Sequence, residues 1–206
     1  MEIVKGTAKW RKLRANPRFA GKTIGFVPTM GALHAGHLSL LRRAGRENDL
    51  AVASIFVNPA QFNDPRDLRR YPRTLAADIK KLEAAKTDFL LLPSACDMYP
   101  DGYRYRLSET TDSAVLCGAH RPGHFEGVLT VVMKLLNLVR ADRAYFGEKD
   151  YQQFRLIKGM AEAFFLGTKI VPCPTLREAD GLAMSSRNLL LEPGHRKLAP
   201  ALHKAL

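Results

Sequence analysis

Short apolar strands alternate with longer helical stretches along most of this 206-residue chain. Such alternation is typical of a parallel sheet whose crossover connections are helices. The segment 50–57 (LAVASIFV) is a continuous apolar run, as expected for a strand buried on both faces. We therefore predict an α/β fold with an open parallel sheet flanked by helices. Strands are predicted at 24–29, 50–57, 89–92, 144–146 and 169–171, with a weaker one at 103–108; helices are predicted at about 37–46, 74–86, 127–140 and 151–165, with a helical tail from about residue 193.

The composition excludes several functional classes. No apolar run is long enough to cross a bilayer and the N-terminus lacks a signal-peptide core, so we expect no membrane partner and a cytoplasmic location. Three widely spaced cysteines without a Cys-x-x-Cys pair fit reduced thiols. The net charge of +12 leaves a nucleic-acid-binding module as an alternative. Because the basic residues are scattered and accompany no RNA-binding aromatic signature, zinc finger or basic zipper, we expect no nucleic-acid partner.

The run PTMGALHAGH, residues 28–37, follows the first predicted strand at the point where a helix should begin. A helix N-terminus offers unpaired N–H groups and a partial positive charge, which suit a phosphate. Glycine at positions 31 and 36 lets the backbone approach a ligand. His34 and His37 add donors that become cationic as charge develops. The run therefore indicates nucleotide chemistry.

Three other interpretations of this run compete with that one. The stretch from Gly31 to Gly36 fits the first six positions of a P-loop, but His37-Leu38 stands where Lys and Ser/Thr are required, which excludes a Walker site. A zinc site through His34 and His37 is disfavoured because no glutamate lies between them and Gly36 weakens a helix. For a short motif taken alone, a glycine-containing turn with incidental histidines explains the run equally well.

Polar groups recur after later strands, where ligands bind in open parallel sheets. Asn58 and Gln61 place two amides at a strand end, although Asn58 also fits a capping role in an Asn-Pro turn. Lys149 stands at a helix start, where a cation is unfavourable unless it serves an anionic ligand. Asp150 can cap that helix or accept hydrogen bonds from ribose. Residues 184–187 (MSSR) combine small hydroxyls with an arginine suited to binding phosphate. For that segment taken alone, a plain serine-rich turn is the favoured interpretation.

Together these segments closely resemble the pantothenate synthetase family of ATP-dependent ligases, which join pantoate to β-alanine. The pair His-x-Gly-His and Met-Ser-Ser-Arg also resembles the signature of the wider nucleotidyltransferase superfamily, which implies a Rossmann-like domain. The resemblance covers about residues 24 to 190. The matching runs are PTMGALHAGH, SIFVNPAQF, YPRT, RPGHFEGVLTVV, YFGEKDYQQ and PTLREADGLAMSSRN.

The resemblance implies that pantoate attacks the α-phosphate of ATP, and that β-alanine then attacks the resulting pantoyl adenylate. It implies Mg²⁺ held mainly through the phosphates, no metal ligands from the protein, and a homodimer. The expected catalytic residues are His37, His34, Lys149 and Arg187. The family would assign His37 as proton donor, but its role stays open here, because stabilising the leaving pyrophosphate needs a donor and not necessarily a full proton transfer. The expected ATP-binding residues are Met30, Gly31, Ala32, Leu33, His34, Ala35, Gly36, His37, Gly147, Glu148, Lys149, Asp150, Leu176, Met184, Ser185, Ser186 and Arg187; Gln61 and Gln153 are expected to bind pantoate, and Gln61 also β-alanine.

Two departures from the family pattern carry expectations of their own. Cys117 stands where family members often have glutamate, so an acidic contact is missing or replaced by water. Family enzymes continue well beyond residue 206, so we divide the chain into a binding domain, 1–175, and the incomplete start of a C-terminal lid domain, 176–206. Without a full lid we expect ATP binding and poor pantothenate synthesis. Adenylyl transfer to another carboxylate stays open, because fold and ATP motifs alone do not choose the acceptor.

Overall fold

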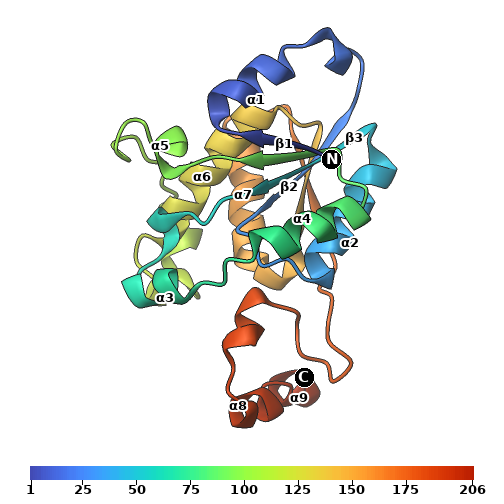
Figure 1. Cartoon of the computed structure of the whole chain (residues 1–206). Helices are drawn as coiled ribbons and strands as arrows, with labels where there is room; N and C mark the ends of the chain where they lie inside the picture. Colours follow the sequence, from blue (N-terminus) through green and yellow to red (C-terminus); the bar gives the residue numbers. More distant parts are fainter.

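Six parallel strands form one sheet in the order β1-β4-β3-β2-β5-β6 in the computed structural model, which describes all residues 1–206 (Figure 1). The chain starts at one edge strand and then builds the sheet outward from β2 in both directions. The strands are β1 (Glu2–Lys5), β2 (Ile24–Thr29), β3 (Leu50–Ile55), β4 (Phe89–Leu92), β5 (Arg143–Gly147) and β6 (Lys169–Cys173). The helices are α1 (Thr7–Arg14), α2 (Ala35–Glu47), α3 (Pro65–Arg70), α4 (Leu75–Ala84), α5 (Ala95–Met98), α6 (His124–Val139), α7 (Tyr151–Ala163), α8 (Pro193–Leu198) and α9 (Ala201–Ala205).

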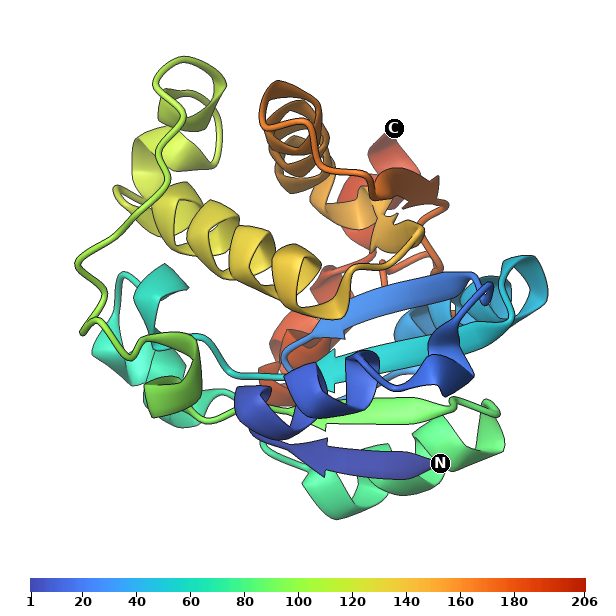
Figure 2. The ribbon, with the colours of Figure 1, turned by 90° about the horizontal axis from the view of Figure 1, so that it is seen from above.

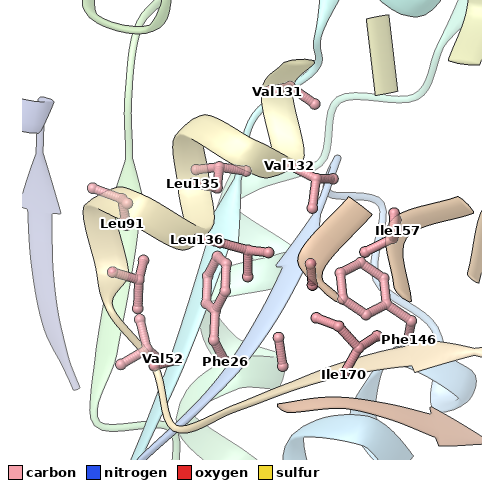
Figure 3. Close-up of a cluster of buried hydrophobic side chains, with 14 of the residues drawn as sticks. Phe26, Val52, Leu91, Val131, Val132, Leu135, Leu136, Phe146, Ile157 and Ile170 are labelled. Atoms are coloured by element: carbon pink, nitrogen blue, oxygen red, sulfur yellow. The ribbon is translucent and has the colours of Figure 1, made fainter. Parts of the chain in front are cut away.

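Alternate residues of each strand supply two separate hydrophobic cores, one on each face of the sheet. Phe26 points into the larger core and its neighbour Val27 into the smaller one. The larger core packs α1, α6 and α7 on the sheet, and Figure 3 shows Phe26 and Val52 gathered with Leu135 and Leu136 of α6. In the view of Figure 2, α6 lies along this face. The smaller core packs α2 and α4 on the opposite face. Both faces are covered, which explains the continuous apolar strands.

β2 and its neighbour β5 separate toward their carboxyl ends. β2 pairs with β5 only at Gly25 and Phe26, whereas its pairing with β3 continues through to Thr29. Pro28 lies in the part of β2 that does not pair with β5. Because proline has no backbone N–H, no hydrogen-bond donor is left unpaired there. Chain order reverses between β2 and β5, so this gap is the switch point at which open α/β sheets bind ligands.

Most predicted elements are present, with ends shifted by a few residues, and the predicted α/β class with a parallel sheet is confirmed. The weak strand predicted at 103–108 is wrong. Gly102 and Tyr103 adopt positive φ angles of 63° and 65°, which form a turn, and the Leu107 N–H donates to Thr130 Oγ1 instead of to a strand. The sequence analysis missed β1, α1, α3 and α5, which are short or strongly basic.

Residues 176–206 lie below the sheet in Figure 1 and contain α8 and α9. They touch the sheet domain through the segment around Ser186, whose Oγ donates to the Ala32 carbonyl at 2.9 Å. The division at residue 175 remains a prediction. None of the helices combines the length and hydrophobicity needed to span a bilayer.

Candidate active site

A cavity of about 220 Å³ opens where β2 and β5 separate. Its apolar floor comes from the α6 side chains Val128, Val131, Val132 and Leu135. Polar residues from four separate segments form its rim, at the carboxyl ends of β2, β3 and β5 and in the loop after β6. Sequence-distant polar groups thus converge on one pocket, which is typical of a small-molecule site.

The loop that follows β2 is pinned from below by a buried carboxylate. Asp78 of α4 is 1% exposed and accepts hydrogen bonds from the backbone N–H groups of Ala32 at 2.9 Å and Leu33 at 2.7 Å. Gly31 has a φ of 83°, and a Cβ there would lie 3.2 Å from Asp78 Oδ2, so glycine suits both the turn and the close approach. These two amides are therefore taken by Asp78 and are not available to a phosphate. The unpaired N–H groups at the start of α2 remain.

His34 and His37 stack at the start of α2, with ring centroids 4.0 Å apart. The His34 ring covers Gly36, where a Cβ would lie 2.9 Å from the imidazole, so Gly36 makes room for the histidine. The His34 N–H donates to His37 Nδ1 at 3.3 Å, which leaves the ring proton of neutral His37 on Nε2. The His34 side chain faces the His37 backbone N–H in a reciprocal capping box, without a well-formed hydrogen bond at the buried Nδ1.

Both histidines are neutral at physiological pH. Burial, together with the neighbouring His34, Lys149 and Lys81, lowers the pKa of His37 to about 3. Burial and the same two lysines lower the pKa of His34. In the free protein these side chains are uncharged because they are poorly solvated and face other positive charges; that they become cationic as charge develops on a ligand stays a prediction. Neutral His37 therefore carries its ring proton on Nε2.

Lys149 and Asp150 lie on the opposite rim, directly after β5. Lys149 Nζ contacts Asp150 Oδ1 at 3.0 Å. Asp150 occupies the N-cap position of α7 but makes no side-chain capping bond, so the capping alternative is wrong and the carboxylate is available to a ligand. Gly147 lines the cavity, whereas Glu148 is exposed outside it.

The segment 184–187 closes a third side of the cavity. Arg187 forms a two-pronged pair with Asp67 of α3, at 2.9 Å and 3.3 Å. Its guanidinium also lies 5.4 Å from the ring centroid of Tyr71, within cation–π range. The pairing with Asp67 raises the pKa of Arg187, so the residue is a permanent cation. Ser186 is buried and holds this segment against the loop after β2.

Gln61 reaches the cavity from the turn after β3, and Asn58 fixes its side chain. Asn58 is 1% exposed and accepts a hydrogen bond from the Ala60 N–H, as predicted for a capping Asn in an Asn-Pro turn. Its Nδ2 donates to Gln61 Oε1 and to the Gly127 carbonyl, both at 3.1 Å. A Cβ on Gly127 would lie 2.4 Å from the Ala60 carbonyl, so only glycine allows this approach of α6 to the turn.

His124 holds the backbone of the same turn. Arg121 Nη1 lies 3.0 Å from His124 Nε2, and because arginine only donates, that nitrogen accepts. His124 Nδ1 then donates to the Gln61 carbonyl at 2.8 Å. Gln61 is thus fixed at both its side chain and its backbone, as a substrate-positioning residue requires.

The cavity collects most but not all of the predicted site residues. Gly31, Ala32, Leu33, Ala35 and Glu148 do not line it. The residues that do are Met30, His34, Gly36, His37, Gln61, Gly147, Lys149, Asp150, Gln153, Leu176, Met184, Ser185, Ser186 and Arg187.

Four site-forming residues were missed by the sequence analysis. Asp78 pins the loop after β2, and Lys81 Nζ donates to the Leu33 carbonyl at 2.5 Å. Tyr71 lines the cavity and Asp67 pairs with Arg187. All four residues lie within residues 67–81. The sequence analysis used this stretch only through the run YPRT of the resemblance. The four residues act through tertiary contacts, which a local sequence pattern does not show.

The matching family is the pantoate–β-alanine ligase family, whose profile covers residues 2–206. A pantothenate synthetase from Bdellovibrio bacteriovorus is 57% identical over 197 residues, which span 96% of this chain and 76% of the relative. A pantothenate synthetase from Thermodesulfovibrio yellowstonii is 51% identical over all of this chain and 74% of its own length.

Solved structures agree with these sequence relatives. The crystal structure of a pantothenate synthetase from Thermus thermophilus superposes with a TM-score of 0.93 at 49% identity, over 100% of this chain and 73% of that one. A pantoate-β-alanine ligase from Francisella tularensis, described as complexed with β-γ ATP and β-alanine, gives a TM-score of 0.94 at 45% identity. It covers 99% of this chain and 78% of that structure.

Proposed function

Because the chain belongs to the pantoate–β-alanine ligase family, its reaction is the ATP-dependent condensation of pantoate with β-alanine, and we propose that the cavity between β2 and β5 performs it in two steps. In the first step a pantoate carboxylate oxygen attacks the α-phosphorus of ATP, and the bond to pyrophosphate breaks. In the second step the β-alanine amine attacks the acyl carbon. Pantothenate then forms, AMP leaves with the bridging oxygen, and the amine loses a proton.

The main support for this assignment is the distribution of charge and polarity around the cavity. Two cations, Lys149 and Arg187, and the neutral donor His37 reach the cavity from three separate segments of the chain. The triphosphate would occupy the space between them, where fixed positive charge stabilises the charge that develops during in-line transfer. We assign His34 to a phosphate oxygen, because its ring lines the cavity and its Nδ1 faces the His37 backbone N–H, which leaves Nε2 to carry the ring proton and donate.

Pantoate fits the other half of the cavity. Its carboxylate and hydroxyls need polar partners, and its two methyl groups need apolar surface. Gln61 and Gln153 supply amides, and Val131 and Val132 of α6 supply the apolar floor. We assign Gln61 to β-alanine as well, since the amine must arrive next to the activated carboxyl group.

The remaining assignments concern the nucleotide and its metal ion. Asp150 is the only carboxylate among the cavity-lining residues, and we assign it to the ribose hydroxyls. Leu176 and Met184 supply apolar surface for adenine. With that single carboxylate engaged, Mg²⁺ would be held mainly through phosphate oxygens, and when bound it neutralises phosphate charge.

A homodimer and a cytoplasmic location complete the proposal. Val115, Leu116 and Tyr151 are 52%, 74% and 54% exposed, and Gln152 bonds the Val115 carbonyl, which places these side chains near one another as a candidate contact for a second copy. Light scattering of the purified chain tests the dimer. The three free cysteines suit a reducing compartment.

Pantoate-dependent exchange of pyrophosphate into ATP tests the assignment, because it follows the first step without β-alanine. We expect exchange that requires pantoate and is lost in Gln61→Ala unless pantoate is raised well above its normal concentration. Exchange without pantoate, or with unrelated carboxylates equally well, would contradict the assignment.

A further inference from the structure

The side-chain amide of Gln61 has one permitted orientation, and its neighbours determine it. The Ala60 N–H can only donate, so the Asn58 atom that faces it is the carbonyl oxygen Oδ1. The Gly127 carbonyl can only accept, so the Asn58 atom that faces it is the nitrogen Nδ2. Nδ2 also faces Gln61, which therefore turns its own oxygen Oε1 toward Asn58 at 3.1 Å. The NH₂ group of Gln61 is left to face the cavity.

Tyr99, next to α5, makes the shortest hydrogen bond to Asn58. Its hydroxyl donates to Asn58 Oδ1 at 2.7 Å, compared with 3.3 Å for the Ala60 N–H. Burial raises the pKa of Tyr99 far above its usual value, so the hydroxyl keeps its proton and stays a donor. Tyr99 does not line the cavity, so its hydroxyl acts on a bound substrate only through Asn58.

The Tyr99 ring is itself held rigidly. The Tyr103 ring meets it edge-on with centroids 5.1 Å apart, and Lys134 Nζ lies 4.7 Å above its face. Lys134 is fixed in turn by the Met98 carbonyl at 2.8 Å and by Asp101. The hydroxyl therefore reaches Asn58 from a rigid support.

We propose that Tyr99 is a positioning residue for pantoate: its hydroxyl holds Asn58 so that Gln61 offers two N–H donors to the substrate. A site of this kind selects an acceptor, such as a carboxylate or hydroxyl oxygen, and disfavours a group that can only donate. The inference rests on the proposed function of the cavity and extends it to a residue that no substrate touches.

Tyr99→Phe is the direct test, and Tyr103→Phe is its matched control. Tyr103 is adjacent, of the same type, and its hydroxyl is buried without a hydrogen-bond partner. In pyrophosphate exchange, Tyr99→Phe should raise the KM for pantoate about five- to tenfold, as expected for one lost neutral hydrogen bond. The KM for ATP should stay unchanged, and Tyr103→Phe should leave both values unchanged.

A double-mutant cycle with Gln61→Ala separates positioning from a general structural role. If Tyr99 acts through Gln61, adding Tyr99→Phe to Gln61→Ala gives no further rise in the KM for pantoate. A full further rise, or an equal rise in the KM for ATP, would overturn the inference, as would an unchanged pantoate KM in Tyr99→Phe alone. Absence of pantoate-dependent exchange in the wild-type chain would instead contradict the proposed function, and the inference with it.

Discussion

Asp78→Asn should destabilise the protein far more than its conservative appearance suggests. In the native structure, one buried carboxylate accepts the N–H groups of both Ala32 and Leu33, and Thr74 Oγ1 lies 3.2 Å from it. An asparagine offers one carbonyl oxygen and one NH₂ group at the same place. One of the two loop N–H groups must then face another donor.

The magnitude follows from these contacts. Leaving a buried donor without an acceptor costs about 1–3 kcal/mol, and the surviving bond loses about 1 kcal/mol with its charge assistance. We therefore expect a loss of about 2–4 kcal/mol in the free energy of unfolding, or about 5–15 °C in Tm for a chain of this size. ATP should bind at least about tenfold more weakly, because the loop that carries His34 and His37 is displaced.

Thermal and urea denaturation measure the loss, and Asp49→Asn is the matched control. Asp49 also accepts a backbone N–H and a hydroxyl, both from Thr23 and at 2.8 Å and 2.7 Å, but it is exposed, so water replaces the lost bonds. It should cost less than about 1 kcal/mol. Equal, small losses in both variants would refute the view that Asp78 pins the loop.

Three further predictions concern the charged rim of the cavity. Lys149→Ala should reduce pantoate-dependent exchange by orders of magnitude with a normal Tm; near-normal exchange would remove Lys149 from the assignment. The pKa of His37 is lowered from 6.5 to about 3 on folding, so the unfolded chain binds the extra proton and stability falls as the pH drops through that window. Between pH 6.5 and 4, the Tm of His37→Gln should therefore fall less than the Tm of the wild type. Parallel curves of Tm against pH for the two proteins would contradict a neutral, buried His37. The pair between Asp67 and Arg187 is partly exposed, so Asp67→Asn should cost less than about 1 kcal/mol. Calorimetry should show tighter ATP binding in Asp67→Asn, because the Arg187 guanidinium no longer has to give up its ion pair with the Asp67 carboxylate when it binds a phosphate. Weaker binding would show that Asp67 positions the arginine.

The sheet could be predicted from the sequence because its signals are local. Leu50–Ile55 and Phe89–Leu92 are apolar runs bounded by turn residues, and their strand assignments needed no knowledge of their partners. The strand predicted at 103–108 failed because Thr130, far away in sequence, captures the Leu107 N–H. Pairing across such separations is not encoded in a local pattern.

The candidate site divides in the same way. His37, Lys149 and Arg187 could be selected because each occurs in a distinctive loop motif after a strand. Asp78 and Tyr99 could not, since each acts through hydrogen bonds with residues more than 40 positions away. Their sequence neighbourhoods are those of ordinary helix and turn residues.

The transfer of oxygen from pantoate to AMP tests the central claim most directly. Pantoate labelled with ¹⁸O in both carboxylate oxygens would be incubated with the protein, ATP, Mg²⁺ and β-alanine. Mass spectrometry would then measure the ¹⁸O content of the nucleotide and phosphate products. Attack of the carboxylate on the α-phosphorus predicts AMP that carries one ¹⁸O atom and pyrophosphate that carries none. Unlabelled AMP, or ADP with labelled phosphate, would contradict adenylation in this cavity.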